Sequence, residues 1–241
     1  MSPVRSSNRW SVTRTAGPVV LSLGSINVDF QMRVDRPIGS GETSPASDLT
    51  RLGGGKAANR AFLARKLGVE TWLLGRVGED ELAEQALSPL RAAGVDLAGV
   101  SVAPEHATAI SIIAVPPDGK KSILLAGNAD DTWDGEAIDR AVARVLVAPA
   151  RSVLTVDYEI PAPVVRRIAA AARTCGVHLI IDPSWPARVE DDVLAITLAI
   201  APDAASHLTV TGWGSQPAYP TRPEIEALLP RLARTIRTMP C

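Results

Sequence analysis

The sequence has few cysteines, few histidines and few aromatic residues, and these shortages exclude several classes of protein. Of its 241 residues, two are cysteine, three are histidine and 4% are aromatic. Cys175 and Cys241 suggest no disulfide framework, and with the scattered histidines they show no zinc-binding spacing. We therefore expect no metal site built from cysteine and histidine.

Long apolar runs and blocks of like charge are also missing. The formal net charge is −1 and no long Lys/Arg block occurs, so the charge pattern of a nucleic-acid-binding protein is absent. No apolar run approaches the roughly 20 residues of a membrane-spanning helix. Residues 1–18 lack the apolar region of a secretory signal, although a short transit peptide would share their Arg/Ser character. We expect a disordered tail over 1–18 and a cytoplasmic protein that binds neither nucleic acid nor membrane.

The remaining sequence alternates between strand-like and helix-like segments. Hydrophobic residues make up 46% and charged residues 21%, which fits one α/β domain over residues 19–241. The patterns predict strands at 19–23, 71–74, 151–157 and 177–182, and helices at 56–67, 80–93, 134–147, 161–175 and 223 to about 237. Repeated strand–helix units imply an open, mostly parallel sheet with helices on both faces.

Two segments interrupt this alternation. Residues 30–52 contain several prolines and glycines and favour short strands and turns, and residues 108–126 predict a hairpin around Asp118-Gly119. We expect the two to pair as a small β lid. A loop is expected over 212–220, and the helix after it has no following strand before Cys241, so we expect a domain that lacks its C-terminal strands.

Asn27 and Asp29 follow the first predicted strand and are two residues apart. In extended backbone such residues point to the same side, so an amide and a carboxylate converge where open α/β sheets bind ligands. A carboxylate accepts from adjacent hydroxyl groups, while an asparagine both donates and accepts, so the pair suits a polyol. The alternative is that both residues merely cap a turn.

A run of three glycines, residues 53–55, precedes the helix predicted at 56–67. It is no phosphate-binding P-loop, because Ala57 stands where that loop needs Ser or Thr, and it lacks the dinucleotide-binding spacing. The glycines instead allow close approach of the backbone, and Asn59 follows one helical turn later. These features suit an oxygen-rich small molecule.

Glu159 lies between the strand predicted at 151–157 and a helix that begins at Pro161. A carboxylate at this place either contacts a ligand or stabilises the helix N-terminus through the helix dipole. The residue taken alone leaves both interpretations open.

In combination, these motifs resemble the ribokinase-like (PfkB) family of carbohydrate kinases over about residues 19–212. The segments that carry the resemblance are 24–29, 54–59, 158–161 and 181–188, with 41–43 similar to the family's lid. The resemblance implies an ATP-dependent kinase that phosphorylates a hydroxyl group of a ribose-like sugar, with ATP and Mg²⁺ as cofactors. The residues that it implies for sugar binding are Asn27, Asp29, Gly54, Gly55, Lys56, Asn59 and Glu159. In ribokinases the lids also pair two subunits, so a homodimer through the lid is a further implication.

The sequence departs from the family pattern in two places, and both concern the part of the site that would bind the ATP phosphates and magnesium. The family's Asn-x-x-Glu motif, which organises magnesium, falls at 203–206, where Asp203 and Ser206 replace Asn and Glu. Asp203 can still attract a cation, but Ser206 cannot supply the negative charge. The family's Gly-Ala-Gly-Asp segment, which carries the anion hole and the catalytic Asp, is expected beyond residue 241. We therefore expect weak binding of ATP and Mg²⁺, and no catalytic residue, in the chain as written.

Three interpretations of function follow. The first is a C-terminally truncated or frame-shifted member of the sugar kinase family with negligible kinase activity. The second is a sugar-binding pseudokinase with a regulatory or interaction role. The third is a chain whose exposed sheet edge makes it aggregate. A dinucleotide-dependent dehydrogenase fits least, because the fingerprint of such a protein is absent.

Overall fold

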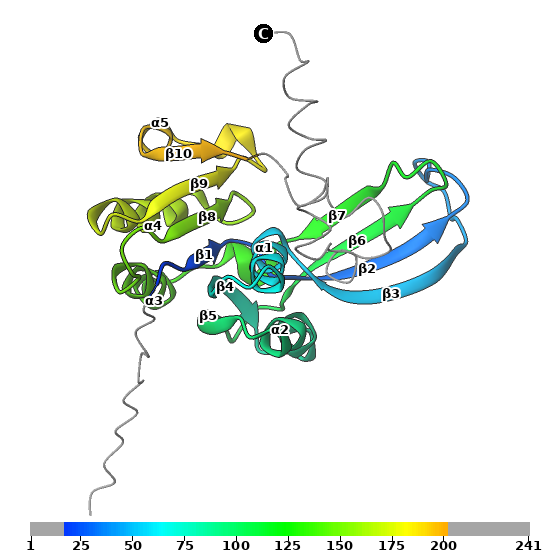
Figure 1. Ribbon diagram of the computed structural model, residues 1–241. Helices are drawn as coiled ribbons and strands as arrows, with labels where there is room; N and C mark the ends of the chain where they lie inside the picture. The colour runs from blue at the N-terminus through cyan, green and yellow to red at the C-terminus, as the bar shows by residue number, and fades with distance from the viewer. Residues whose placement is uncertain (1–16, 202–241) are drawn as a thin grey trace, which may run out of the picture.

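Residues 17–201, which the computed structural model of the protein describes, form an α/β fold with two separate sheets (Figure 1). Several predicted features lie outside these residues. They are most of the tail 1–18, the motif with Asp203 and Ser206, the loop 212–220 and the helix from residue 223.

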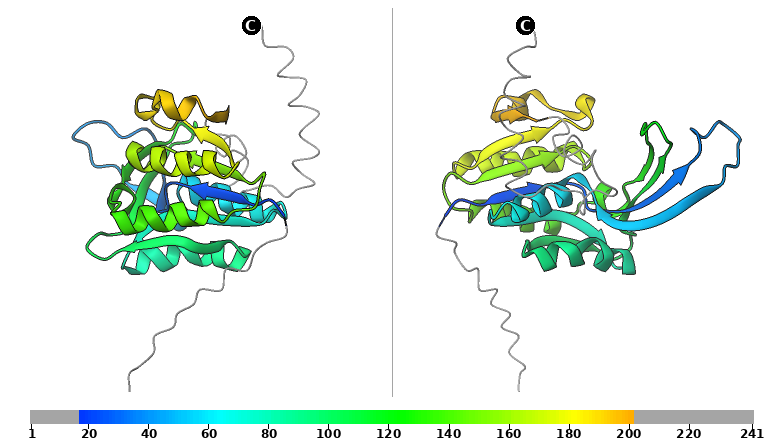
Figure 2. Two further views of the ribbon diagram at one scale, coloured as in Figure 1. Left: turned by 90° about the vertical axis from the view of Figure 1, so that its left-hand side faces the viewer. Right: turned by 45° about the vertical axis from the view of Figure 1, so that its right-hand side comes forward.

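The large sheet is entirely parallel and has six strands in the order β10-β9-β8-β1-β4-β5. Its strands are β1 Val20–Leu23, β4 Thr71–Gly78, β5 Asp96–Ala103, β8 Val153–Asp157, β9 His178–Asp182 and β10 Thr197–Ile200. Helices α1 Lys56–Lys66 and α2 Glu81–Ala93 pack on one face, and α3 Gly135–Leu146 and α4 Ala162–Thr174 on the other (Figures 1 and 2). The predicted fold class is confirmed.

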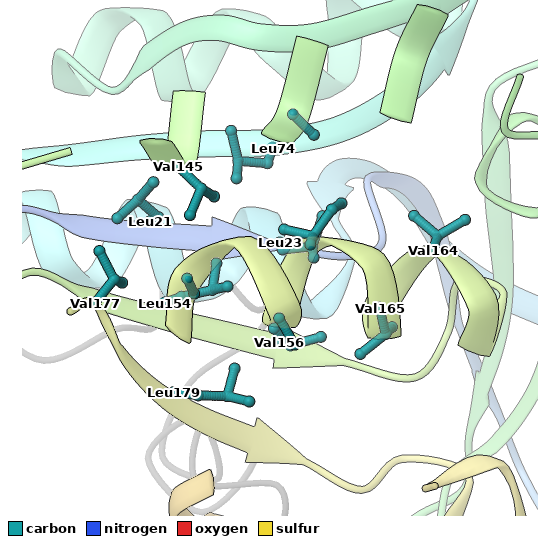
Figure 3. Close-up of a cluster of buried hydrophobic side chains, with 14 of the residues drawn as sticks. Leu21, Leu23, Leu74, Val145, Leu154, Val156, Val164, Val165, Val177 and Leu179 are labelled. Atoms are coloured by element: carbon teal, nitrogen blue, oxygen red, sulfur yellow. The ribbon is translucent and has the colours of Figure 1, made fainter. Parts of the chain in front are cut away.

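Alternation along the parallel strands sends side chains to two apolar layers. Leu21 of β1 pairs in register with Trp72 of β4 and with Leu154 of β8, so these side chains share one face. Figure 3 shows the layer under α3 and α4, which includes Leu21, Leu23, Leu74, Val145, Leu154, Val156, Val164, Val165, Val177 and Leu179. Ser22 faces the other layer, where its hydroxyl donates to the carbonyl of Ala57 in α1 (2.8 Å). This bond ties α1 to the strand before the candidate site.

The small sheet has four strands in the order β3-β2-β6-β7 and projects from the side of the large sheet (Figures 1 and 2). Its strands are β2 Asn27–Val34, β3 Ala46–Gly54, β6 Ala109–Val115 and β7 Ser122–Ala126. β2 pairs antiparallel with β3 and parallel with β6, and β6 pairs antiparallel with β7. The hairpin predicted around Asp118-Gly119 is confirmed, with Gly119 at a φ of 74°.

Three details differ from the predictions. The segment 30–52 does not consist of short strands, because β2 and β3 have eight and nine residues and the prolines and glycines lie mainly in the loop between them. Strand β5 was not predicted, since its interior contains Gly99 and small side chains. Strand β10 was missed as well, because it has only four residues.

Short helical segments complete the described chain: η1 Asn128–Asp131, η2 Pro186–Arg188 and α5 Asp191–Leu194. The chain crosses between the two sheets four times, after β1, β3, β5 and β7. Of the helices within residues 17–201, none has the length and apolar character needed to span a membrane.

Candidate functional site

The predicted site residues lie where the large sheet meets the small one. Gly24, Ser25 and Ile26 connect β1 of the large sheet to β2 of the small sheet. The carboxyl end of β8 and the first turn of α1 adjoin this connection. Ligands of open α/β sheets bind at the carboxyl ends of the strands, so the location suits a binding site.

Glu159, which follows β8, is held by two groups from the connection and from α1. The Ser25 hydroxyl donates to Glu159 Oε2 (2.7 Å), and Lys56 Nζ lies 3.9 Å from Glu159 Oε1. Burial and, second to it, the negative charge of Asp157 raise the pKa of Glu159 to about 7, while Lys56 and the Ser25 hydroxyl oppose the rise. Glu159 is therefore a carboxyl group that exchanges its proton near neutral pH.

Asp157, two residues before Glu159, organises the base of the site. Its carboxylate is fully buried and accepts from the backbone N–H of Ser25 (3.3 Å) and of Glu159 (3.1 Å). Arg60 of α1 contacts it at 2.8 Å, and the same guanidinium lies 3.5 Å from Asp182 at the end of β9. One arginine thus connects the ends of two neighbouring strands to α1.

Asn27 and Asp29 lie within β2, not in a turn beyond a strand. Both are buried, with Asn27 3% exposed, and their backbone pairs with β3 and β6. Asn27 Nδ2 donates to the Ser111 hydroxyl of β6 (3.0 Å), whereas Asn27 Oδ1 is buried without a partner. The turn-cap alternative is wrong, because both residues have extended, paired backbone.

The consecutive glycines are explained by close contacts. A Cβ atom on Gly54 would lie 2.3 Å from the carboxylate carbon of Asp29, so only glycine leaves room for that side chain. Gly55 has a φ of 90°, and a Cβ there would lie 2.4 Å from the carbonyl oxygen of Ser25. Gly54 of β3 therefore leaves room for the Asp29 carboxylate, and Gly55 before α1 leaves room for the backbone of Ser25.

Asn59 lies one helical turn after Gly55, and its backbone N–H donates to the Gly55 carbonyl (2.9 Å). Its side-chain Oδ1, like that of Asn27, is buried and has no hydrogen-bond partner. Two unpaired amide oxygens therefore flank the glycine segment, one on each side of the junction between the sheets.

All seven predicted sugar-site residues thus fall around this junction, while Asp203 lies outside the described residues. Sequence reasoning assigned no role to Ser25, Arg60, Ser111, Asp130 and Asp157. Asp130 is 1% exposed and accepts from the N–H of Ile26 (3.1 Å), and burial raises its pKa well above the ordinary range. The position of Asp157, at the last residue of a predicted strand and two residues before Glu159, was a usable signal. Ser111 and Asp130 carried none.

The described residues provide no obvious binding site for the magnesium that the resemblance implies. Within residues 17–201, no group of three or more His, Cys, Asp or Glu side chains is arranged to hold a metal ion. The buried polar atoms without partners near the junction include the amide oxygens of Asn27 and Asn59 and the Nε of Arg60, and such neutral amide oxygens suit hydroxyl groups better than a divalent cation.

Residues 19–204 match the pfkB family of carbohydrate kinases, and the chain belongs to this family. Among curated relatives, the Staphylococcus aureus (strain COL) ribokinase is 25% identical over 194 residues, which cover 80% of this chain and 63% of that protein. The Arabidopsis thaliana ribokinase is 30% identical over 184 residues, 75% of this chain and 48% of the relative. A bifunctional ribokinase/ribose-5-phosphate isomerase A from Fructilactobacillus sanfranciscensis is 27% identical, with coverage of 80% and 35%. The chain therefore spans about a third to two thirds of the length of these relatives.

Solved structures agree on the fold. A crystal structure named Sa239 superposes with a TM-score of 0.69 at 25% identity, covering 84% of this chain and 67% of that one. A ribokinase from Cryptococcus neoformans var. grubii in complex with ADP gives 0.59 at 25% identity, with coverage of 70% and 52%. The Arabidopsis thaliana ribokinase with ribose and ATP gives 0.63 at 24% identity, with coverage of 90% and 69%, and supports the fold alone.

Proposed function

We propose that the junction between the two sheets binds a ribose-like sugar, as the acceptor side of an ATP-dependent sugar kinase site. Asn27, Asp29 and the glycine segment would contact it from the small sheet and its edge, and Lys56, Asn59 and Glu159 from the large-sheet side. The small sheet would act as the lid over the sugar. Ribose is favoured because the curated relatives described above are ribokinases.

The observation that carries this proposal is the pair of buried, unpaired amide oxygens of Asn27 and Asn59. A buried acceptor without a partner costs about 1–3 kcal/mol. Most buried polar groups in proteins are satisfied, so these two oxygens require an explanation, and a ligand bound at the junction would supply their missing partners. Sugar hydroxyl groups would donate to these oxygens, and the carboxylates of Asp29 and Glu159 would accept from further hydroxyl groups.

ATP is the phosphoryl donor that the family implies, and it would supply the transferred phosphate. The residue in this chain that would face its magnesium ion is Asp203, outside the described residues. We propose that phosphoryl transfer by the 241-residue chain is negligible, because Ser206 stands where the family has a carboxylate and Asp203 where it has an amide. Asp29 and Glu159 would be engaged with sugar hydroxyl groups and could not also activate one.

Calorimetry with ribose, paired with a coupled assay of ADP release, tests both proposals. We expect binding heat from the intact protein and its loss in Asn27→Ala. The control Arg167→Ala, which removes an exposed ion pair with Asp139, should bind normally. Absence of heat from a folded protein would refute sugar binding, and ribose-dependent ATP turnover would refute the proposed inactivity. Binding without turnover would favour the second candidate, a sugar-binding pseudokinase, since the chain has the residues proposed to contact sugar while Ser206 departs from the family motif.

We also propose a homodimer through the small sheet. The exposed apolar side chains of that sheet are Leu49, Ile112, Ile123, Leu124 and Leu125, with Leu124 71% exposed. Ile112 and Leu124 are register partners and share one face of the sheet, so burying them against a second copy would remove apolar surface from water. Light scattering after size-exclusion chromatography should report a dimer for the wild type and a monomer for Leu124→Lys, and a wild-type monomer at all concentrations would contradict the proposal.

A further inference from the structure

The hydroxyl and the backbone N–H of Ser25 make three hydrogen bonds at the centre of the junction, and the residue is fully buried. Its hydroxyl donates to Glu159 Oε2 (2.7 Å) and accepts from the backbone N–H of Lys56 (2.9 Å). Its own N–H donates to the Asp157 carboxylate (3.3 Å). The side chain therefore links the carboxyl end of β8 to the first turn of α1.

The direction of these bonds is fixed by chemistry. A backbone N–H only donates, so the Ser25 oxygen must accept from Lys56, and its single O–H proton is then directed to the carboxylate of Glu159. The backbone of Ser25 is also held, because its carbonyl accepts from the N–H of Ala58 in the first turn of α1 (3.3 Å). Ser25 cannot turn away without breaking the start of α1.

We propose that Ser25 is a positioning residue that fixes the orientation of Glu159 and favours its ionised form. With Oε2 occupied by the Ser25 hydroxyl, Oε1 is left to face Lys56 and a ligand hydroxyl group. The part of this proposal that concerns sugar rests on the function proposed above, whereas the effect on Glu159 itself does not.

The charges around Glu159 show why a neutral donor matters there. The ionised carboxylate faces Lys56 of α1 and is close to further acidic groups on β8, β9 and η1, which are Asp157, Asp182 and Asp130. Arg60 is already engaged with Asp157 and Asp182. Besides Lys56, the Ser25 hydroxyl is the group that favours the ionised form of Glu159.

The test compares Ser25→Ala with wild type by carbon NMR titration of the Glu159 carboxyl group, first without sugar. We expect the Glu159 pKa to rise by about one unit in the variant, since a hydrogen bond to a charged group contributes about 1.5–3 kcal/mol and one unit corresponds to about 1.4. Ribose affinity at pH 7 should fall about fivefold, because the ionised fraction of Glu159 falls from about one half to about one tenth, and the dependence of affinity on pH should move upward by about one unit.

Ser152→Ala is the matched control. Ser152 is also fully buried and its hydroxyl oxygen accepts from a backbone N–H, that of Val19 (3.0 Å), just before β8 begins. It should leave the Glu159 pKa unchanged. If Ser25→Ala does not fold, Ser25→Cys keeps the size and weakens the donor, and it should also raise the pKa.

An unchanged Glu159 pKa in the folded variant would overturn the proposal. If the variant loses ribose affinity equally at every pH, so that the pH profile of binding is unchanged, the binding part of the proposal is overturned. A purely structural role of Ser25 predicts that result. If Ser25→Ala shows the expected pKa shift while the wild-type protein binds no ribose, the sugar function is refuted and the role of Ser25 stands.

Discussion

The guanidinium of Arg60 lies 2.8 Å from the carboxylate of Asp157, which is fully buried at the end of β8. The same arginine also donates to the carbonyl of Leu23 at the end of β1 (3.2 Å) and lies 3.5 Å from Asp182. The ends of β1, β8 and β9 therefore meet at one side chain from α1. Each strand end next to the candidate site depends on this contact.

Arg60→Ala should destabilise the protein strongly, because it leaves Asp157 buried without a countercharge. Removing one partner of a buried ion pair typically costs about 3–5 kcal/mol. Urea unfolding measures the loss. Arg167→Ala removes a pair of similar length, 2.7 Å, whose members are both exposed, and should cost less than about 1 kcal/mol. Equal losses of unfolding free energy in the two variants would show that burial of the ion pair does not determine its contribution to stability.

Gly54→Ala should abolish sugar binding while the fold is retained. The added methyl group would overlap the Asp29 carboxylate and displace it from the site. We expect ribose affinity, measured by calorimetry, to fall at least tenfold, or about 1.4 kcal/mol. Gly135→Ala is the control, since a Cβ at the first residue of α3 meets nothing within 4 Å. Normal ribose binding by Gly54→Ala would show that Asp29 does not belong to the sugar-binding site.

Asn59→Ala should weaken ribose binding while leaving the stability of the unliganded protein nearly unchanged. The Asn59 side-chain oxygen is buried without a partner, so deleting it removes a penalty along with some packing. We expect the free energy of unfolding without ligand to change by less than about 1 kcal/mol, and ribose affinity to fall about tenfold. A large loss of stability would show that the amide serves the fold rather than a ligand.

Glu159 should make the protein less stable as the pH rises toward neutrality. Its pKa is about 7 in the folded protein and ordinarily 4.5, so between these values the folded state holds a proton that the unfolded state releases. The stabilisation is complete below about pH 4.5 and is lost as the pH rises to 7. Denaturant titrations from pH 4.5 to 7.5 should show this decline, and Glu159→Gln should flatten it. The buried Asp130 acts in the same direction, so part of the slope should remain. Identical slopes would contradict the assignment.

Local patterns predicted most of the fold. Strand–helix alternation is recorded in short-range periodicity, and the helices confirmed by the structure differ from the expected ranges by one residue at each end or less. Two strands were missed because neither had a strong pattern: β5 contains Gly99, and β10 is very short. The length of β2 and β3 depends on their pairing with each other, which local composition does not record.

The candidate site likewise contains residues that local sequence motifs predicted and contacts that they could not predict. The residues recognised from sequence, such as Asn27 and Gly54, belong to compact motifs. The contacts that hold them connect distant parts of the chain: Arg60 and Asp157 are 97 residues apart, and Asn27 and Ser111 are 84 apart. Such partners depend on sheet register, so they became visible only in the folded structure.

The four crossings between the two sheets have a mechanical consequence. The proposed ligand contacts lie on both sides of these crossings, with Asn27 and Asp29 in the small sheet and Asn59 and Glu159 beside the large one. A molecule bound there would contact residues of both sheets at once, so it would restrain the position of the small sheet relative to the large one. Substitutions at the crossings could therefore change ligand affinity without altering any atom that touches the ligand.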